Sequence, residues 1–245
     1  MHIRRLLLTI LSIVTALSLF SSSADLPDFS QYPAGNARKT AFFQFLKPIV
    51  VEENTKILKE RNFMLSFKFR YNQGLDISDK DMKRFCAVAR KYKLDPNNID
   101  LQSFWDKVNL RIDMVPPEIA LIQAAVESGW GTSGFVREGN NLFGVWTFRQ
   151  GMGIVPKDRH PEANHEIRIY ESINDSIASY MLNLNTNKAY KKLRDTRLEM
   201  RQNAEPIDPV QLCEGLIHYS QKKLEYVNLI QKMIENNMEE ISSIK

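Results

Sequence analysis

Cysteine and histidine are scarce in this chain of 245 residues, which has two cysteines and four histidines. Cys86 and Cys213 fit neither the close spacing of a redox pair nor the ligand spacing of a zinc site. They permit one disulfide in an exported protein or two buried thiols, and the sequence leaves both open. His160 and His165 lack a carboxylate or cysteine at a recognised ligand spacing, so we expect no metal site.

A strong excess of either charge is also absent. The chain has 33 basic and 29 acidic residues, and two of the basic ones, Arg4 and Arg5, lie in an N-terminal segment that we expect to be removed. The remaining chain has 31 basic and 29 acidic residues. Nucleic acid is a polyanion that is usually bound by a concentrated basic surface, so the composition does not indicate a nucleic-acid partner.

Long hydrophobic runs are confined to the first residues of the chain. The apolar run from Leu6 to Phe20 follows two arginines and precedes the small residues of segment 21–24. This is the plan of a secretory signal peptide over residues 1–24, and the run is shorter than the roughly 20 residues of a bilayer span. We therefore expect an exported protein with no transmembrane span after cleavage. An uncleaved N-terminal anchor is the alternative.

Two segments follow before the second half of the chain. Residues 25–38 are rich in proline, serine and glycine, which predicts a flexible linker. Residues 39–113 carry apolar side chains at three- and four-residue steps, which predicts a helical N-terminal segment. Pro48 predicts a kink or a break, with a second helix over residues 53–65 and a third after Asp79. Nothing in this segment indicates chemistry beyond packing.

The second half, residues 114–241, predicts a domain of its own. A helix is expected from Glu118 to Ser128, because two prolines precede it and Gly129 permits the left-handed turn that ends a helix. Glycines punctuate residues 139–170, which predicts a small β-hairpin with its turn at residues 160–164. Helical spacing returns after Ser172. The expected fold is therefore α+β and mostly helical, with a cleft between helices and hairpin.

Glu127 is the residue whose position indicates chemistry. It lies in the last turn of an apolar helix, where the negative end of the helix dipole and the apolar neighbours both disfavour an ionised carboxylate. Both effects raise the pKa of a carboxyl group, as a general acid requires. Taken alone, the same position also suits an ordinary exposed glutamate at a helix end.

Two motifs around Glu127 decide between these readings. Residues 123–131 read QAAVESGWG, and residues 141–144 read NLFG. Together they resemble the glucosaminidase family of the lysozyme-like superfamily, in which the first motif ends the active-site helix and the second opens the β-lobe. The resemblance covers residues 115–240. The helical segment before it is similar to the Bax-type periplasmic subgroup of this family.

The resemblance implies a lysozyme-like fold and an activity. A member of the family is expected to hydrolyse the β-1,4 bond of peptidoglycan glycan strands on the N-acetylglucosamine side, with Glu127 as general acid and without a cofactor. Such a protein would work in the periplasm of a Gram-negative bacterium. The N-terminal helices could hold a partner from the cell-wall machinery, although no specific residue indicates one.

Glycosidases usually need a second carboxylate, and in relatives the β-lobe supplies it. The candidates here are Glu166, Asp158 and Glu162. Glu166 is slightly favoured because it lies on the expected strand, and Asp158 follows because its basic neighbours would keep it ionised. The 2-acetamido group of the substrate could also serve as an internal nucleophile and replace both.

Several further side chains are expected at a sugar-binding groove, because aromatic faces pack against pyranose rings. We assign Trp130, Asn141, Trp146 and Tyr190 to substrate binding. The resemblance places most weight on Tyr219, which matches a tyrosine that relatives bring close to the catalytic acid. In contrast, the apolar setting of Phe143 and Tyr226 indicates packing in the core.

Two other functions remain open. A lytic transglycosylase or muramidase of the same superfamily also uses a single glutamate at a helix end. A non-catalytic peptidoglycan-binding assembly protein could keep the groove and lack turnover, since the second carboxylate is not identified.

Overall fold

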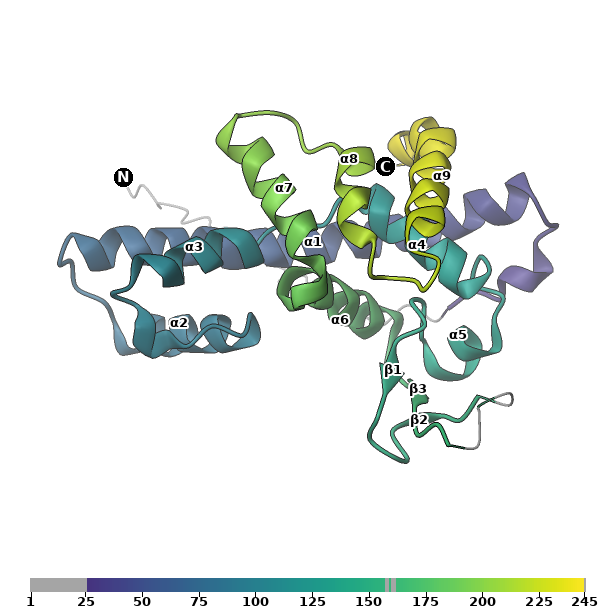
Figure 1. The fold of residues 1–245 in the computed structure, drawn as a ribbon, viewed down its shortest axis with the longest axis horizontal. Helices are drawn as coiled ribbons and strands as arrows, with labels where there is room; N and C mark the ends of the chain where they lie inside the picture. Colours follow the sequence, from purple (N-terminus) through teal and green to yellow (C-terminus); the bar gives the residue numbers. More distant parts are fainter. Residues whose placement is uncertain (1–25, 157–158, 160–161, 245) are drawn as a thin grey trace, which may run out of the picture.

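The computed structural model describes residues 26–156, 159 and 162–244. The helices are α1 (Asn36–Asn72), α2 (Asp79–Lys91), α3 (Gln102–Arg111), α4 (Pro117–Ser128), α5 (Gly134–Gly139), α6 (Ile173–Thr186), α7 (Lys191–Gln202), α8 (Pro209–Leu212) and α9 (Leu224–Ser243). The strands are β1 (Trp146–Thr147), β2 (Gly153–Ile154) and β3 (Glu166–Arg168). The mostly helical α+β architecture expected of a lysozyme-like domain is confirmed (Figure 1). Among the described residues, no helix is both long and apolar enough to span a membrane.

Helix α1 runs without a break for 37 residues along the long axis of the molecule (Figure 1). The break at Pro48, one of the two expected alternatives, and the separate helix over residues 53–65 were therefore wrong. Proline removes the hydrogen bond to the carbonyl of Gln44, but both residues lie on the exposed side of the helix, where water can hydrate that carbonyl. Buried side chains at Leu46 and Val50 hold the opposite side in place.

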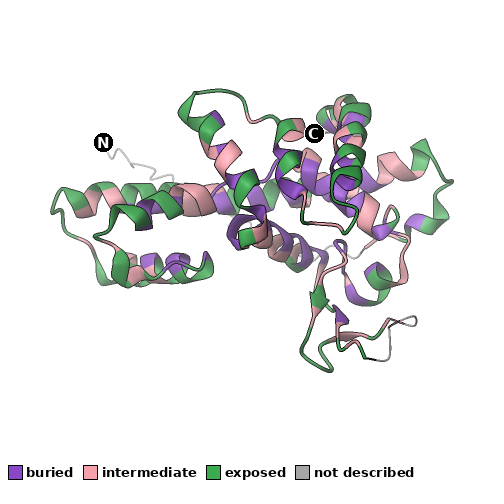
Figure 2. Ribbon diagram, viewed as in Figure 1, coloured by how far each residue is buried: buried purple, intermediate pink, exposed green. Residues whose placement is uncertain are grey.

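Two hydrophobic clusters pack against this one helix. The large core joins the first half of α1, including Phe42 and Phe43, to α4, α6 and α9. The small core joins Met64 and Phe67, from the second half of α1, to α2 and α3. Figure 2 shows the buried positions concentrated in α4, α6 and the inner side of α9. The first half of α1, which the sequence assigns to the N-terminal segment, is thus part of the core that carries the second half of the chain.

The described part of the expected linker is folded. Residues Phe29–Gln31 form a 3-10 turn that is capped by Asp28, and Phe29 is 0% exposed. The ring of Phe29 contacts Phe42 edge to face, with 5.3 Å between ring centroids. A Cβ at Gly131 would collide with this ring, so only glycine fits there. Composition predicted a tether, but one large aromatic side chain anchors the segment in the large core.

A buried ionic cluster fixes the junction between the helical segment and α4. Asp113 is 1% exposed and forms ion pairs with Arg61 of α1 and with Arg197 and Arg201 of α7. Arg197 also donates to the side chain of Asn185 on α6 and to the carbonyls of residues 110, 113 and 114. These contacts bind residues 110–114 to three helices at once.

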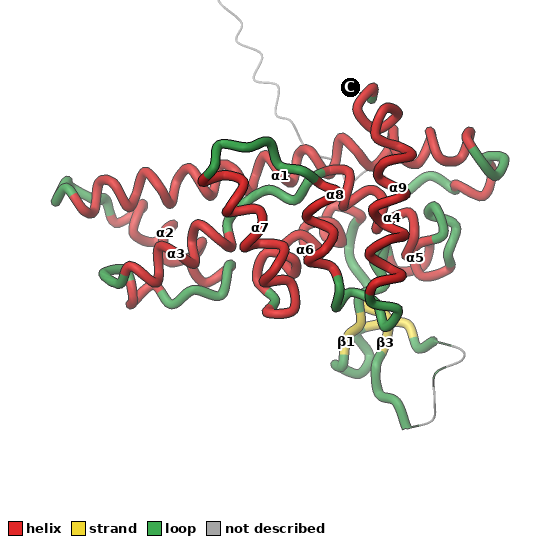
Figure 3. The backbone as a smooth tube through the Cα atoms, turned by 45° about the horizontal axis from the view of Figure 1, so that its top comes forward, coloured by secondary structure: helices red, strands yellow, loops and turns green. Residues whose placement is uncertain are grey.

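The β-lobe is a three-stranded antiparallel sheet in the order β1-β3-β2, at the edge of the helical body (Figure 3). Ile167 of β3 pairs with Trp146 on one side and with Ile154 on the other. The expected hairpin therefore gains a third strand, because residues after Asn141 return to pair with β3. Part of its expected turn, including His160, lies outside the described residues.

The two cysteines are free thiols in different cores. Cys213 is buried in the large core, and Cys86 packs against the small core. Of the two possibilities that the sequence left open, the structure shows thiols.

Candidate active site

Helix α4 carries Glu127 into the centre of the molecule. It begins after Pro116 and ends at Gly129, whose φ of 58° is left-handed and whose N–H bonds the carbonyl of Ala125. Trp130 and Gly131 continue the left-handed turn, with φ angles of 59° and 76°. The predicted helix and its glycine end are confirmed. The turn leaves Glu127 half-buried in the last helical turn.

Among the described residues, a side-chain donor and a loop glycine lie close to the two oxygens of Glu127. The hydroxyl of Tyr226 on α9 donates to Oε1 over 2.7 Å. Gly144, from the loop that leads into β1, faces Oε2, and a Cβ at that position would lie 3.8 Å from it. Burial raises the pKa of Glu127, and the hydrogen bond from Tyr226 partly opposes the rise. The net shift is upward, in the direction that the sequence predicts.

A chain of buried hydrogen bonds fixes the direction of that donor. Tyr180 donates to Oε1 of Gln123 over 2.6 Å, and Nε2 of Gln123 donates to the hydroxyl of Tyr226 over 2.8 Å. Because the Tyr226 oxygen already accepts from an amide, its own hydrogen is directed to Glu127. Gln123 is 0% exposed, so the chain is shielded from water.

Three tyrosines gather around this carboxylate. Tyr219 stacks on Tyr226 with ring centroids 5.5 Å apart and an angle of 8° between the rings. Tyr190 packs at a tilt against Tyr219, 6.1 Å away. Burial, with a contribution from the charge of Glu127, raises the pKa of Tyr190 to about 12. The structure thus places the expected Tyr190 and Tyr219 in one cluster with Glu127.

The tyrosine that donates to Glu127 is one that sequence reasoning missed. Tyr226 was expected to pack in the core, and Tyr219 was the tyrosine expected close to Glu127. The hydroxyl of Tyr219 instead donates to the carbonyl of Phe143 over 3.1 Å. Gln123 provided the missing signal, because it lies one helical turn before Glu127 and is the polar side chain of an otherwise apolar stretch. A buried amide requires partners, so Gln123 indicated a polar side chain facing α4.

The two tryptophans expected at the groove differ in their surroundings. Trp130 packs edge to face on Phe42 and Phe43, with centroid distances of 5.7 and 5.5 Å. It belongs to the packing between α1 and the end of α4. Trp146 is 52% exposed and stacks on His165, 4.2 Å away, which leaves an aromatic face open to solvent. Of the two, Trp146 is the one available to a ligand.

Asn141 is buried and ties the β-lobe together. Its amide donates to the carbonyls of Val145 and Arg168 and accepts from the N–H of Val145. Both amide hydrogens are used in this way, so the side chain has no donor left for a sugar. Asn141 thus has a structural role in the β-lobe, and its assignment to substrate binding stays a prediction.

The expected second carboxylates do not join Glu127 in the described hydrogen bonds. Glu166 is 6% exposed, and its Oε1 accepts from the N–H of Gly151 over 3.0 Å. Its Oε2 has no hydrogen-bond partner among the described residues. Glu162 is exposed in the loop before β3, and Asp158 lies outside the described residues. Within the described ranges, no group of three or more His, Cys, Asp or Glu side chains could hold a metal ion.

The chain around this site matches a known family and a known protein. The family model described as mannosyl-glycoprotein endo-beta-N-acetylglucosaminidase matches residues 105–239, which include α4, the β-lobe and most of α9. The chain is 30% identical over 226 residues to a protein of Escherichia coli (strain K12) named Protein bax, and the match covers 91% of this chain and 78% of that protein. No solved structure matches the chain significantly.

Proposed function

We propose a reaction for this chain, which belongs to the glucosaminidase family. The protein hydrolyses the β-1,4 bond of peptidoglycan on the N-acetylglucosamine side, with Glu127 as general acid. The observation that carries the proposal is the setting of Glu127: half-buried at the end of α4, with a raised pKa and with one oxygen facing the loop to the β-lobe. Family membership supports a glycosidase that acts on the cell wall. The cleaved bond and the role of Glu127 are the proposed steps.

The two oxygens of Glu127 have different roles in this proposal. Oε1 accepts the hydrogen bond from Tyr226, so the acidic proton belongs on Oε2, on the side of Gly144. The proton passes from Oε2 to the leaving glycosidic oxygen as positive charge develops on the sugar carbon. Tyr226 then stabilises the carboxylate that remains. Burial raises the pKa of Glu127 and the hydrogen bond from Tyr226 lowers it, with a net rise that favours the protonated form.

Three groups are candidates for the second catalytic role beside Glu127. Glu166 is the favoured carboxylate by sequence, but it is buried and its Oε1 is bonded to Gly151, so it must leave this contact to act. Asp158 is the second carboxylate candidate. The 2-acetamido group of the substrate needs no further carboxylate, and the tyrosine cluster of Tyr190 and Tyr219 lies beside Glu127 to position it. We favour the substrate-assisted route on these contacts.

The place of action follows from the substrate. A protein that acts on peptidoglycan works outside the cytoplasm, and the N-terminal signal pattern supports export into the periplasm of a Gram-negative bacterium. The partner of the site is the glycan strand. A further part of the proposal is that the helices of the N-terminal segment bind a partner from the wall machinery.

Mass spectrometry of wall glycan tests the proposal. The chain without residues 1–24 is incubated with purified glycan beside Glu127→Gln, which keeps the shape and removes the acid. The proposal is supported if the chain without residues 1–24 produces fragments with N-acetylglucosamine at the reducing end and Glu127→Gln produces none. Ends in N-acetylmuramic acid or its anhydro form indicate the muramidase or transglycosylase, and glycan binding without cleavage by either protein indicates the assembly protein.

A further inference from the structure

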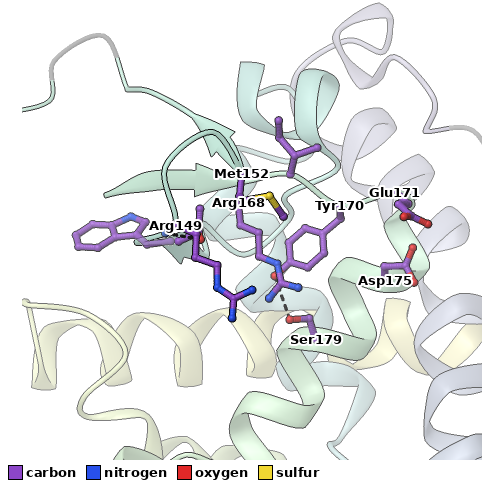
Figure 4. A pocket seen from close by; sticks show the side chains of 10 residues that line it. Arg149, Met152, Arg168, Tyr170, Glu171, Asp175 and Ser179 are labelled. Atoms are coloured by element: carbon purple, nitrogen blue, oxygen red, sulfur yellow. Dashed lines mark hydrogen bonds between the residues drawn. The ribbon is translucent and has the colours of Figure 1, made fainter. Parts of the chain in front are cut away.

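A cavity of about 810 Å³ lies on the β-lobe, apart from the tyrosine cluster around Glu127. Its walls are β1 with the loop that follows, β3 with the residues after it, and the first turns of α6 (Figure 4). We call it the lobe pocket. Trp146, with its exposed ring, forms part of its lining. The mechanism proposed above uses no residue of this pocket.

The lobe pocket separates two positive from two negative charges. Arg149 and Arg168 project toward the same side of it, whereas Glu171 and Asp175 lie beyond the ring of Tyr170 (Figure 4). The guanidinium of Arg168 is 4.8 Å from the centre of that ring, which holds it in place. Among the described residues, neither arginine forms a salt bridge, and neither does Glu171. Charges of both signs are therefore available to a ligand.

The pocket begins close to the catalytic carboxylate along the chain. Gly144 lies against Glu127, and Trp146 follows two residues later, a length of about 7 Å of chain. A peptide extends by about 3.5 Å for each residue. A group two or three residues out on a branch of the glycan can therefore reach the Trp146 wall of the pocket while the sugar backbone lies at Glu127.

We propose that the lobe pocket binds the peptide branch of peptidoglycan through a residue that carries both a carboxylate and an amine. Arg149 and Arg168 bind the carboxylate, and Glu171 and Asp175 bind the ammonium group. A diamino acid in the branch supplies both charges on one residue, whereas N-acetylated glucosamine carries neither. This proposal rests on the proposed function, because it takes peptidoglycan as the substrate. It makes the enzyme prefer glycan that still carries its peptides.

The test compares two soluble substrates, a peptide-bearing glycan fragment and the same fragment after enzymatic removal of its peptides. One variant combines Arg149→Gln with Arg168→Gln. The other is Glu171→Gln, at an exposed position. Asp175 is left intact because it accepts a hydrogen bond from Ser172 at the start of α6. Arg90→Gln, an exposed arginine on α2, is the matched control.

The expected result is a loss that depends on the peptide. The double variant loses kcat/KM on the peptide-bearing fragment by about fivefold, and Glu171→Gln by about twofold, as exposed charge pairs allow. Both keep the wild-type rate on the peptide-free fragment, and the losses on the peptide-bearing fragment shrink at high salt. Equal losses on the two substrates would overturn the proposal and assign the pocket to the glycan. Wild-type rates on both fragments would overturn it as well.

A binding measurement separates this proposal from the proposed function. The protein is titrated with a disaccharide that carries the peptide and with the bare disaccharide, and amide NMR shifts are followed in β1, β3 and the first turns of α6. Shifts that require the peptide and disappear in the double variant support the pocket even if no glycan is cleaved. Shifts absent from these segments overturn the proposal even if glycan is cleaved.

Discussion

The hydroxyl of Tyr226 donates a hydrogen bond to Oε1 of Glu127 over 2.7 Å, although 99 positions separate the two residues. The bond crosses from α9 to α4, so a residue of α9 contributes to the pKa of the proposed catalytic acid. Gln123 fixes its direction by donating to the same hydroxyl oxygen.

Tyr226→Phe is expected to raise the pKa of Glu127 further, because it removes the hydrogen bond that favours the ionised form. A general acid must be protonated, so activity falls as the pH rises through its pKa. The alkaline limb of kcat/KM against pH should therefore move to higher pH in the variant. Tyr219→Phe is the control, because its hydroxyl bonds Phe143 and not Glu127. A limb that stays or moves to lower pH would contradict the assignment.

The same variant is expected to be less stable, by about 1–3 kcal/mol, because the buried amide of Gln123 loses its acceptor. Urea unfolding at a fixed pH measures this. A variant as stable as the wild type would show that the amide finds another acceptor.

Glu127→Gln is expected to gain stability relative to the wild type as the pH rises from about 4 to 7. The folded protein binds the Glu127 proton more tightly than the unfolded chain, so its contribution is full below the unfolded pKa and is lost as the pH rises through the folded pKa. Glutamine does not titrate. Thermal unfolding of both proteins across this range measures the difference, and a difference independent of pH would mean that the folded pKa is ordinary.

Asp113→Asn is expected to cost about 3–5 kcal/mol, because it leaves the buried Arg197 without its counter-charge. Burial raises the pKa of Asp113, but the hydrogen bonds from Arg201 and the charges of Arg197 and Arg61 outweigh it and lower the pKa. The stability that Asp113 provides is therefore present above the unfolded pKa and lost as the pH falls through the folded one. Asp195→Asn, which breaks an exposed pair with Lys191, should change stability by less than about 1 kcal/mol.

Phe29→Ala is expected to cost about 3–5 kcal/mol, as for a large aromatic side chain removed from a core. Tyr32→Ala, at an exposed neighbour, should cost less than about 1 kcal/mol. Denaturant unfolding compares the two. Equal stabilities would mean that the segment is the free tether that its composition predicts.

Local signals in the sequence predict what depends on local structure. Pro116 and Gly129 mark the ends of α4 because they act on the backbone beside them, and Glu127 follows from its place at that end. The family motif adds the β-lobe. Its third strand escaped prediction because β1 and β2 are two residues each, too short for an alternating pattern.

Other errors arose where tertiary contacts override local preference. The aromatic ring of Phe29 anchors a segment rich in turn-forming residues, and the packing of α1 carries the helix through Pro48. The bonds by which the amide of Asn141 ties the β-lobe together are also tertiary contacts that the sequence does not indicate. The pairing of Tyr226 with Glu127 depends on how α9 crosses α4, which no local pattern contains.

The reach of the large core along the chain has a consequence for the order of events in folding. This core includes Phe29 near the beginning of the sequence and Ile241 near the end of it. The hydroxyl of Thr40 on α1 also donates a hydrogen bond to Glu240 on α9. Contacts of such high sequence separation form only when both partners are present. The large core cannot close while the chain is still emerging from a ribosome or a translocation pore. The site around Glu127, which α9 completes through Tyr226, is therefore assembled only after the whole chain has been delivered.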